Sequence, residues 1–262
     1  MQLLAVSLLI AVGGITLLQD RLLYFPERVP LADLLAMTRA DRLQAWPGEG
    51  DFRGLVREPD GPARATLVLF HGNAGHAGHR AAYAPLAALG VRVILAEYPG
   101  YGPRGGGISE AALVADAADT LRQVRQQFGG PLLVAGESLG AGVVAAAAGQ
   151  PGTPADGMLL LTPWDNLAAV AGHHYPWLPV RLLLRDRYDS AGHLAQATVP
   201  VGIVVAGRDD IVPAQFGVRL HDGLATPKRL WRLDGAGHND WLDRVDAAWW
   251  REVLGFFVPA IR

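Results

Sequence analysis

The chain has 262 residues, of which 50% are hydrophobic and 18% charged, and it contains no cysteine. This length suits one large core and a single catalytic domain. A net charge of −2 gives no electrostatic basis for binding nucleic acid. The lack of cysteine excludes disulfides, thiolate metal sites and a cysteine nucleophile.

The N-terminus carries an uncharged apolar run, LLAVSLLIAVGGITLL, at residues 3–18. As a helix it would span about 24 Å, and residues up to Phe25 could extend it across the ~30 Å hydrocarbon core. No Lys or Arg precedes Arg21 and no small-residue cleavage site follows, which disfavours a signal peptide. A buried core helix is the other alternative. We expect residues 1–25 to be a single-pass transmembrane anchor, in a bacterial inner membrane, and residues 26–262 to form the folded domain.

Regular alternation of strand-like and helix-like segments follows. A helix is predicted at 31–43 and a first strand at 52–56. Further strands are predicted at 66–70, 91–96, 132–135, 158–161, 201–206 and 229–233. Helices are predicted between or after them at 80–89, 109–128, 139–148, 214–224 and 241–257. Continuously apolar strands separated by helices are typical of a mostly parallel sheet covered on both faces.

One interval interrupts this alternation. Residues 164–198 contain no strand-like run, only short helical stretches, and the interval is far longer than the ~5-residue median connection. We predict a small helical lid over the site. Its apolar side chains Tyr175, Trp177 and Leu178 are candidates for lining a substrate acyl chain, although packing of the lid on the core would explain them too.

The segment LLVAGESLGAGVVAAAAG at residues 132–149 presents Ser138 between a strand and a helix. A serine hydroxyl becomes a nucleophile when a sharp turn exposes it and a base removes its proton. Gly136 and Gly140 leave room for such a turn. In a chain of this composition, such a pentapeptide arises by chance at a rate of about 0.06 per chain. A catalytic role for Ser138 therefore requires partner residues elsewhere in the sequence.

The base and its orienting acid are expected after the later strands. His238 lies in the loop after strand 229–233, and the order serine, acid, histidine is known for this geometry. The loop after strand 201–206 offers adjacent carboxylates, Asp209 and Asp210, and the spacing alone does not separate them. The acid would hold His238 in the correct tautomer without taking its proton.

Donors for the oxyanion are expected from two backbone N–H groups. One is that of Leu139, directly after the nucleophile, and the other is that of Asn73 in the loop after strand 66–70. His71 beside this loop is predicted to make a structural hydrogen bond. His76 and His79 have the spacing of a metal pair, but no third ligand follows nearby in the sequence, so neither a metal nor another cofactor is predicted.

Taken together, the motifs resemble the α/β-hydrolase fold, and within it the membrane-anchored serine hydrolases of the Bem46 and ABHD13/ABHD17-like group. The matching segments are LYFP at 23–26, LFHGNAG at 69–75, EYPGYG at 97–102, the Ser109-Glu110 pair that opens the next helix, GESLG at 136–140, TPWDNL at 162–167, DDIVP at 209–213 and GAGHND at 235–240. The resemblance favours Asp209 over Asp210 as the acid. It implies hydrolysis of acyl esters or thioesters, with membrane lipid nearby. A serine peptidase or amidase and a catalytically silent binding module are the alternatives.

Overall fold

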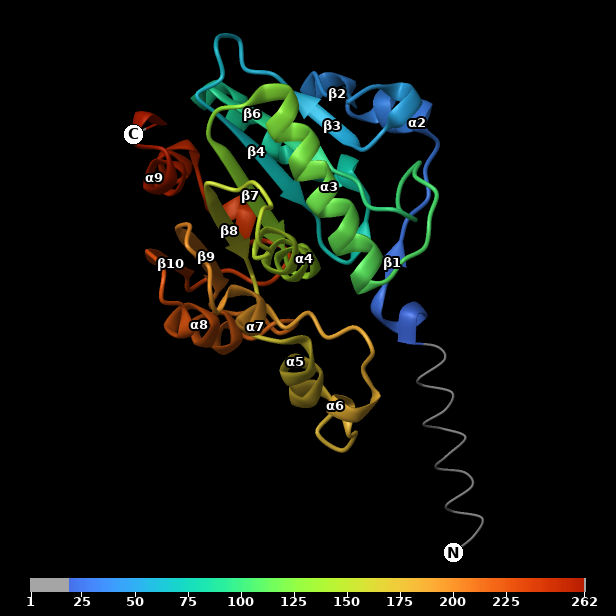
Figure 1. The fold of residues 1–262 in the computed structure, drawn as a ribbon, viewed down its shortest axis with the longest axis vertical. Coiled ribbons are helices and arrows are strands. Elements are labelled where there is room, and N and C mark those ends of the chain that lie inside the picture. The colour runs from blue at the N-terminus through green and yellow to red at the C-terminus, as the bar shows by residue number, and fades with distance from the viewer. Residues whose placement is uncertain (1–18, 262) are drawn as a thin grey trace, which may run out of the picture.

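The computed structural model describes residues 19–261 (Figure 1). Of the anchor predicted at residues 1–25, residues 1–18 lie outside them. Between residues 19 and 261, no helix combines the length and the apolar character that crossing a bilayer requires.

A central sheet of eight strands organises the fold, in the order β10-β9-β8-β7-β4-β6-β3-β2. Neighbours from β10 to β6 pair in parallel, whereas β3 is antiparallel to both β6 and β2. A second, two-stranded sheet pairs β1 with β5. The strands are β1 (Phe25–Pro26), β2 (Gln44–Trp46), β3 (Gly54–Arg57), β4 (Ala65–Phe70), β5 (Ala74–Gly75), β6 (Val91–Ala96), β7 (Leu132–Glu137), β8 (Gly157–Leu161), β9 (Val201–Ala206) and β10 (Lys228–Leu233).

Helices cover both faces of this sheet (Figure 1). The α-helices are α2 (Leu31–Met37), α3 (Glu110–Phe128), α4 (Leu139–Ala148), α5 (Leu167–His174), α6 (Val180–Leu183), α7 (Ser190–Leu194), α8 (Ala214–Gly223) and α9 (Ala247–Phe257). The 3₁₀ helices are η1 (Arg39–Asp41), η2 (Glu49–Asp51), η3 (Ala77–Leu89), η4 (Trp241–Arg244) and η5 (Pro259–Ile261).

Alternating side chains of the buried strands form two separate hydrophobic clusters. In β4, Val68 and Phe70 belong to the cluster that contains residues of α3, α4 and α8, while Leu67 and Leu69 belong to the cluster that contains residues of η3 and α9. The side chains of a strand point alternately to its two faces, so a continuous apolar run serves both clusters. The predicted class, a mostly parallel sheet between helical layers, is confirmed.

Most predicted strands and helices are present, with several differences. The helix predicted at 31–43 ends at Met37 and is followed by the separate 3₁₀ helix η1, and the two-residue strands β1 and β5 were not predicted. Residues 77–89 form a 3₁₀ helix rather than an α-helix, and Pro85 lies inside it. The predicted last helix divides into η4 and α9, because Asp246 caps α9 by accepting from the Trp249 N–H. Strand β2 was not predicted; it is three residues long, and Trp46 is the buried member.

The boundary predicted between anchor and folded domain, at residues 25 and 26, lies too late in the chain, because residues 19–24 pack on the folded domain. Tyr24 is buried in the core cluster, and its hydroxyl contacts Asp186 and Tyr188. Gln19 donates to the Leu183 carbonyl and accepts from the Arg185 N–H. The chain that emerges from the predicted anchor therefore packs against the helical insertion formed by α5, α6 and α7, which lies between β8 and β9.

Candidate active site

The strand–turn–helix around Ser138 has the sharp geometry that the sequence predicts. Ser138 lies between β7 and α4 with φ 52° and ψ −112°, a conformation that a residue with a side chain rarely adopts. Its N–H donates to the Leu161 carbonyl at 2.9 Å, and its carbonyl accepts from Ala141 at 2.9 Å. These bonds hold the strained turn at the carboxyl end of the sheet.

Two glycines make the turn sterically feasible. A Cβ on Gly136 would collide with the Gly140 carbonyl, and a Cβ on Gly140 would collide with the Phe70 carbonyl. Both obstacles are backbone atoms, which cannot swing aside as a flexible side chain can. The GESLG spacing therefore reflects close backbone packing of α4 on β4 and β7.

His238 and Asp209 lie against each other, as the sequence predicts. Nδ1 of His238 is 2.7 Å from Oδ2 of Asp209, and both side chains are buried. The other oxygen of Asp209 accepts from the N–H groups of Ile211 and Val212 at 3.0 and 2.6 Å. Asp210 is exposed, so the structure places the first of the two carboxylates, not the second, beside the imidazole.

Ser138 and His238 line one cavity of about 270 Å³. Asn73 and Asn239 also line it, as do Arg80, Thr162, Ile211 and Trp241. The structure therefore brings together the predicted nucleophile, base and oxyanion-loop residue, with Asp209 behind the base. Their catalytic roles remain predictions.

The predicted oxyanion donors lie on well-supported backbone. Leu139 is the first residue of α4, and an N–H at that position has no acceptor inside its own helix. The Asn73 carbonyl accepts from the Tyr101 hydroxyl at 3.0 Å, and its side chain accepts from the Phe25 N–H at 3.1 Å. His71 makes the expected structural contacts, with Nε2 2.9 Å from Glu97 and Nδ1 2.8 Å from the Gly72 carbonyl.

A buried charge network beside the nucleophile was not predicted. Glu137 pairs with the guanidinium of Arg80 and accepts from the hydroxyl of Tyr83. Burial, with the Glu137 carboxylate beside the phenol, raises the pKa of Tyr83 well above its ordinary value, so the phenol stays a donor. The signal available in the sequence was the charge inside GESLG, which needs a cation partner when buried.

The predicted substrate-binding residues lie apart from the Ser138 cavity. Trp177 is 76% exposed and Tyr175 is also exposed, and neither lines that cavity. Leu178 lines a different cavity of about 710 Å³, between α5, α6 and α8. The insertion does reach the rim, because Nε2 of His174 lies 2.8 Å from the carbonyl of Ile211.

Known proteins share this sequence pattern. A family model described as serine aminopeptidase S33 matches residues 61–185. An uncharacterised protein of Mycobacterium tuberculosis is 37% identical over 250 residues, spanning 90% of this chain and 87% of the relative. The lysophosphatidylserine lipase ABHD12 of Danio rerio is 33% identical over 185 residues, and the match spans 63% of this chain but 48% of that lipase.

Solved structures agree on the fold. An esterase of Pyrococcus furiosus superposes with a TM-score of 0.63 at 16% identity, covering 76% of this chain and 83% of its own. A monoacylglycerol lipase of Paleococcus ferrophilus superposes with a TM-score of 0.58 at 20% identity, covering 78% of this chain and 97% of the lipase. These solved structures show the α/β-hydrolase fold. The chain belongs to the same family as the near full-length mycobacterial relative, and its residues 61–185 match the serine aminopeptidase S33 model.

Proposed function

We propose that this protein is a membrane-anchored serine hydrolase that cleaves carboxylic esters or thioesters with lipid-like acyl chains. The observation that carries the proposal is the 2.7 Å contact between His238 and Asp209 at a cavity that Ser138 also lines. A strained serine on a turn, a histidine and a buried carboxylate are the components of a nucleophilic triad.

In the proposed mechanism, Oγ of Ser138 attacks the carbonyl carbon while Nε2 of His238 takes the hydroxyl proton. The tetrahedral intermediate then collapses, breaking the bond from carbon to the ester oxygen or thioester sulfur. His238 gives its proton to that leaving group. Water attacks the acyl-enzyme in the same way, regenerating Ser138 and releasing the acid.

Asp209 and the oxyanion donors have distinct parts in this cycle. Asp209 accepts from Nδ1–H of His238, which leaves Nε2 unprotonated and able to receive the serine proton. The backbone N–H groups of Leu139 and Asn73 would donate to the oxyanion. Each such donor contributes about 3 kcal/mol to stabilising the transition state.

A lipid-like substrate is supported by the exposed apolar surface of the insertion. Trp177, Tyr175 and Leu182 are exposed there, and His174 connects the insertion to Ile211 on the cavity rim. Two similar proteins are named as lipases that act on lysophosphatidylserine and monoacylglycerol. An acyl chain leaving the cavity past Ile211 would meet this apolar surface.

Anchoring in a bacterial inner membrane is proposed from the uncharged run at residues 3–18. The described part of the chain supports it in one respect. Arg185 forms an ion pair with Asp20 and Gln19 contacts the chain at Leu183, so the start of the domain lies against α6. The exposed apolar residues of the insertion would then be close to the lipid surface. The LYFP motif after the run also supports placement in the Bem46 and ABHD13/ABHD17-like group.

Labelling with a fluorophosphonate probe tests the nucleophile. We expect wild-type protein to be labelled and Ser138→Ala to remain unlabelled, with both showing the same thermal unfolding midpoint. Asn239→Ala, a change at the same cavity, should leave labelling in place. Absence of labelling in folded wild-type protein would contradict the enzymatic function and favour a silent binding module.

A substrate panel tests the reaction class. Acyl esters, acyl thioesters and peptide amides of graded chain length should give the highest kcat/KM for medium or long acyl esters or thioesters. Faster cleavage of the amides would identify a peptidase or amidase instead, as the name of the matched family model would suggest.

Deleting residues 2–18 tests the anchor. This deletion ends before Gln19 and Asp20, so it preserves their contacts with the insertion. We expect the shortened protein to leave the membrane fraction and to keep its activity on soluble esters. Unchanged fractionation would refute the anchor.

A further inference from the structure

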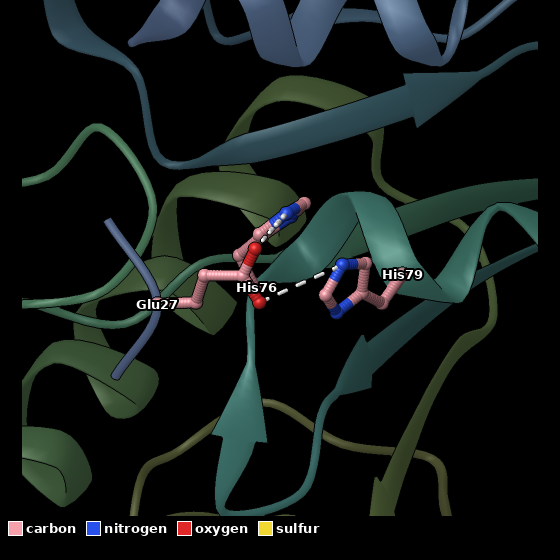
Figure 2. A group of neighbouring side chains, drawn as sticks. All are labelled: Glu27, His76 and His79. Atoms are coloured by element: carbon pink, nitrogen blue, oxygen red, sulfur yellow. Dashed lines mark ion pairs between the residues drawn. The ribbon is translucent and has the colours of Figure 1, made fainter. Parts of the chain in front are cut away.

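A second cluster of polar side chains lies outside the Ser138 cavity and consists of Glu27, His76 and His79 (Figure 2). Glu27 directly follows β1, and the two histidines lie at the start of η3, directly after β5. The pairing of β1 with β5 aligns Pro26 with Gly75, which brings the carboxylate to the histidines. Its oxygens are 3.9 Å from Nε2 of His76 and 3.8 Å from Nε2 of His79.

His76 has a buried ring nitrogen without a partner. Its side chain is 1% exposed, and Nδ1 accepts from the Gly78 N–H at 3.1 Å. The neutral ring therefore carries its proton on Nε2, and that atom has no hydrogen-bond partner within residues 19–261. The Glu27 oxygen at 3.9 Å is too far away to accept it. A buried polar atom without a hydrogen-bond partner calls for a specific explanation, and one such explanation is that the atom binds an ion.

The backbone is shaped to hold both rings in this position. Gly75 adopts φ +89°, and a Cβ there would collide with Nδ1 of His79. A Cβ on Gly78 would lie 3.0 Å from Nδ1 and Cε1 of His76, tighter than side chains ordinarily approach. The two imidazoles can therefore lie with their ring centres 3.9 Å apart.

We propose that Glu27, His76 and His79 form a binding site for a divalent transition metal of the zinc type. Two imidazole nitrogens and one carboxylate oxygen, with water in the fourth position, are an established zinc ligand set. One ligand atom from each residue lies within 4.8 Å of the other two. Tetrahedral bonds of 2.0–2.1 Å would place these atoms about 3.3 Å apart. Glu27 is 56% exposed and His79 44% exposed, so both have room to move inward.

Metal binding would change the protonation pattern of His76 without changing its charge. Coordination through Nε2 displaces the proton from that nitrogen, and the neutral ring then carries its proton on Nδ1. The Gly78 N–H would then lose its acceptor, the Nδ1 atom of His76. In return, the buried Nε2 atom would gain the metal ion as a partner.

The site would have a structural consequence near the proposed oxyanion loop. Glu27 already contacts this segment through its N–H, which donates to the Gly75 carbonyl at 3.2 Å. A bound ion would join the side chain of Glu27 to the start of η3, a few residues after Asn73. This inference does not depend on the proposed hydrolysis, because it concerns residues outside the Ser138 cavity.

Metal titration of the full-length protein tests the site. Chelator-stripped protein is titrated with Zn²⁺ in competition with a chromophoric chelator, and Co²⁺ absorption reports the coordination geometry. We expect one ion per chain and a tetrahedral Co²⁺ spectrum. Glu27→Gln and His79→Gln should each weaken binding by more than about tenfold, the loss that even an outer-shell change can produce.

His193→Gln provides a matched control. Nε2 of His193 lies 3.9 Å from Glu110, and its side chain is 40% exposed. His193 therefore resembles His79 in its exposure and its carboxylate neighbour, but among the described residues it does not belong to a three-residue cluster such as Glu27, His76 and His79. This variant should bind zinc as the wild type does. At equal zinc concentration, the thermal unfolding midpoint should also rise less in Glu27→Gln than in the wild type and in the control. Failure to bind one ion per chain, or equal affinity in wild type, Glu27→Gln and His79→Gln, would overturn the proposal.

Discussion

Replacing Asp209 with Asn would isolate the role of its charge. In the native site one oxygen accepts from the Ile211 and Val212 N–H groups, and the other accepts from His238. An asparagine has a single acceptor oxygen, and the two backbone donors would retain it. Its NH₂ group would then face Nδ1 of His238, which would have to become an acceptor. The imidazole proton would move to Nε2, the atom that must receive the proton of Ser138.

The expected loss follows from this tautomer change. A triad with the wrong histidine tautomer loses about 10⁴-fold in kcat, equivalent to about 5.5 kcal/mol of transition-state stabilisation. The assay is the steady-state hydrolysis of a soluble acyl ester, with thermal unfolding measured in parallel. Folding should be nearly unaffected, because the bonds to Ile211 and Val212 survive.

Asp210→Asn is the matched control, because Asp210 is the exposed neighbour. It should change kcat less than about twofold, as surface substitutions usually do. The reasoning is refuted if Asp209→Asn keeps activity within tenfold of the wild type while remaining folded. An equal loss in Asp210→Asn would also refute it.

Three further predictions concern stability, each measured by denaturant unfolding. Gly140→Ala should lose about 3 kcal/mol, because the new Cβ collides with the Phe70 carbonyl, whereas Gly107→Ala, in open space, should stay within about 0.5 kcal/mol. Glu137→Gln should lose about 2 kcal/mol by leaving the charge of Arg80 uncompensated, while Glu58→Gln, in an exposed pair with Arg92, should lose less than 1 kcal/mol. Stability should also fall above pH 10. Burial raises the pKa of Tyr24, Tyr83, Tyr98 and Tyr188, so these phenols keep protons that the unfolded chain releases. The contribution of these phenols to the free energy of unfolding is complete below pH 10. Above pH 10, the contribution of each phenol falls by about 1.4 kcal/mol per pH unit. A flat stability profile from pH 8 to 11, or equal losses within either variant pair, would contradict these assignments.

The main sheet could be predicted because its strands carry strong local signals. Runs such as Val201–Ala206 are apolar throughout, and burial on both faces requires this. The GESLG turn was recognisable because two glycines must stand at fixed positions around a strained serine. Strand β2 has neither signal, since one of its three residues is buried.

Side-chain clusters that depend on distant segments could not be predicted in the same way. Glu137 and Arg80 are 57 residues apart, and their pairing depends on how η3 packs over the sheet. Glu27 meets His76 through two-residue strands, too short to show any periodicity. The sequence around His76 and His79 therefore shows no third metal ligand, although the fold places Glu27 beside them. Tyr175 and Trp177 were plausible pocket residues by type, but both are exposed and neither lines the Ser138 cavity.

The burial of Tyr24 determines how much freedom the proposed tether would have. Its hydroxyl bonds to Asp186 and Tyr188, so the chain is fixed to the domain within a few residues of the proposed bilayer boundary. No flexible linker separates the two within residues 19–24, and the domain could not swivel freely above the lipid. The angle between the cavity mouth and the membrane plane would then be set by the covalent chain. Substrates would be selected by the depth at which their carbonyl lies in the bilayer, as well as by their chemistry.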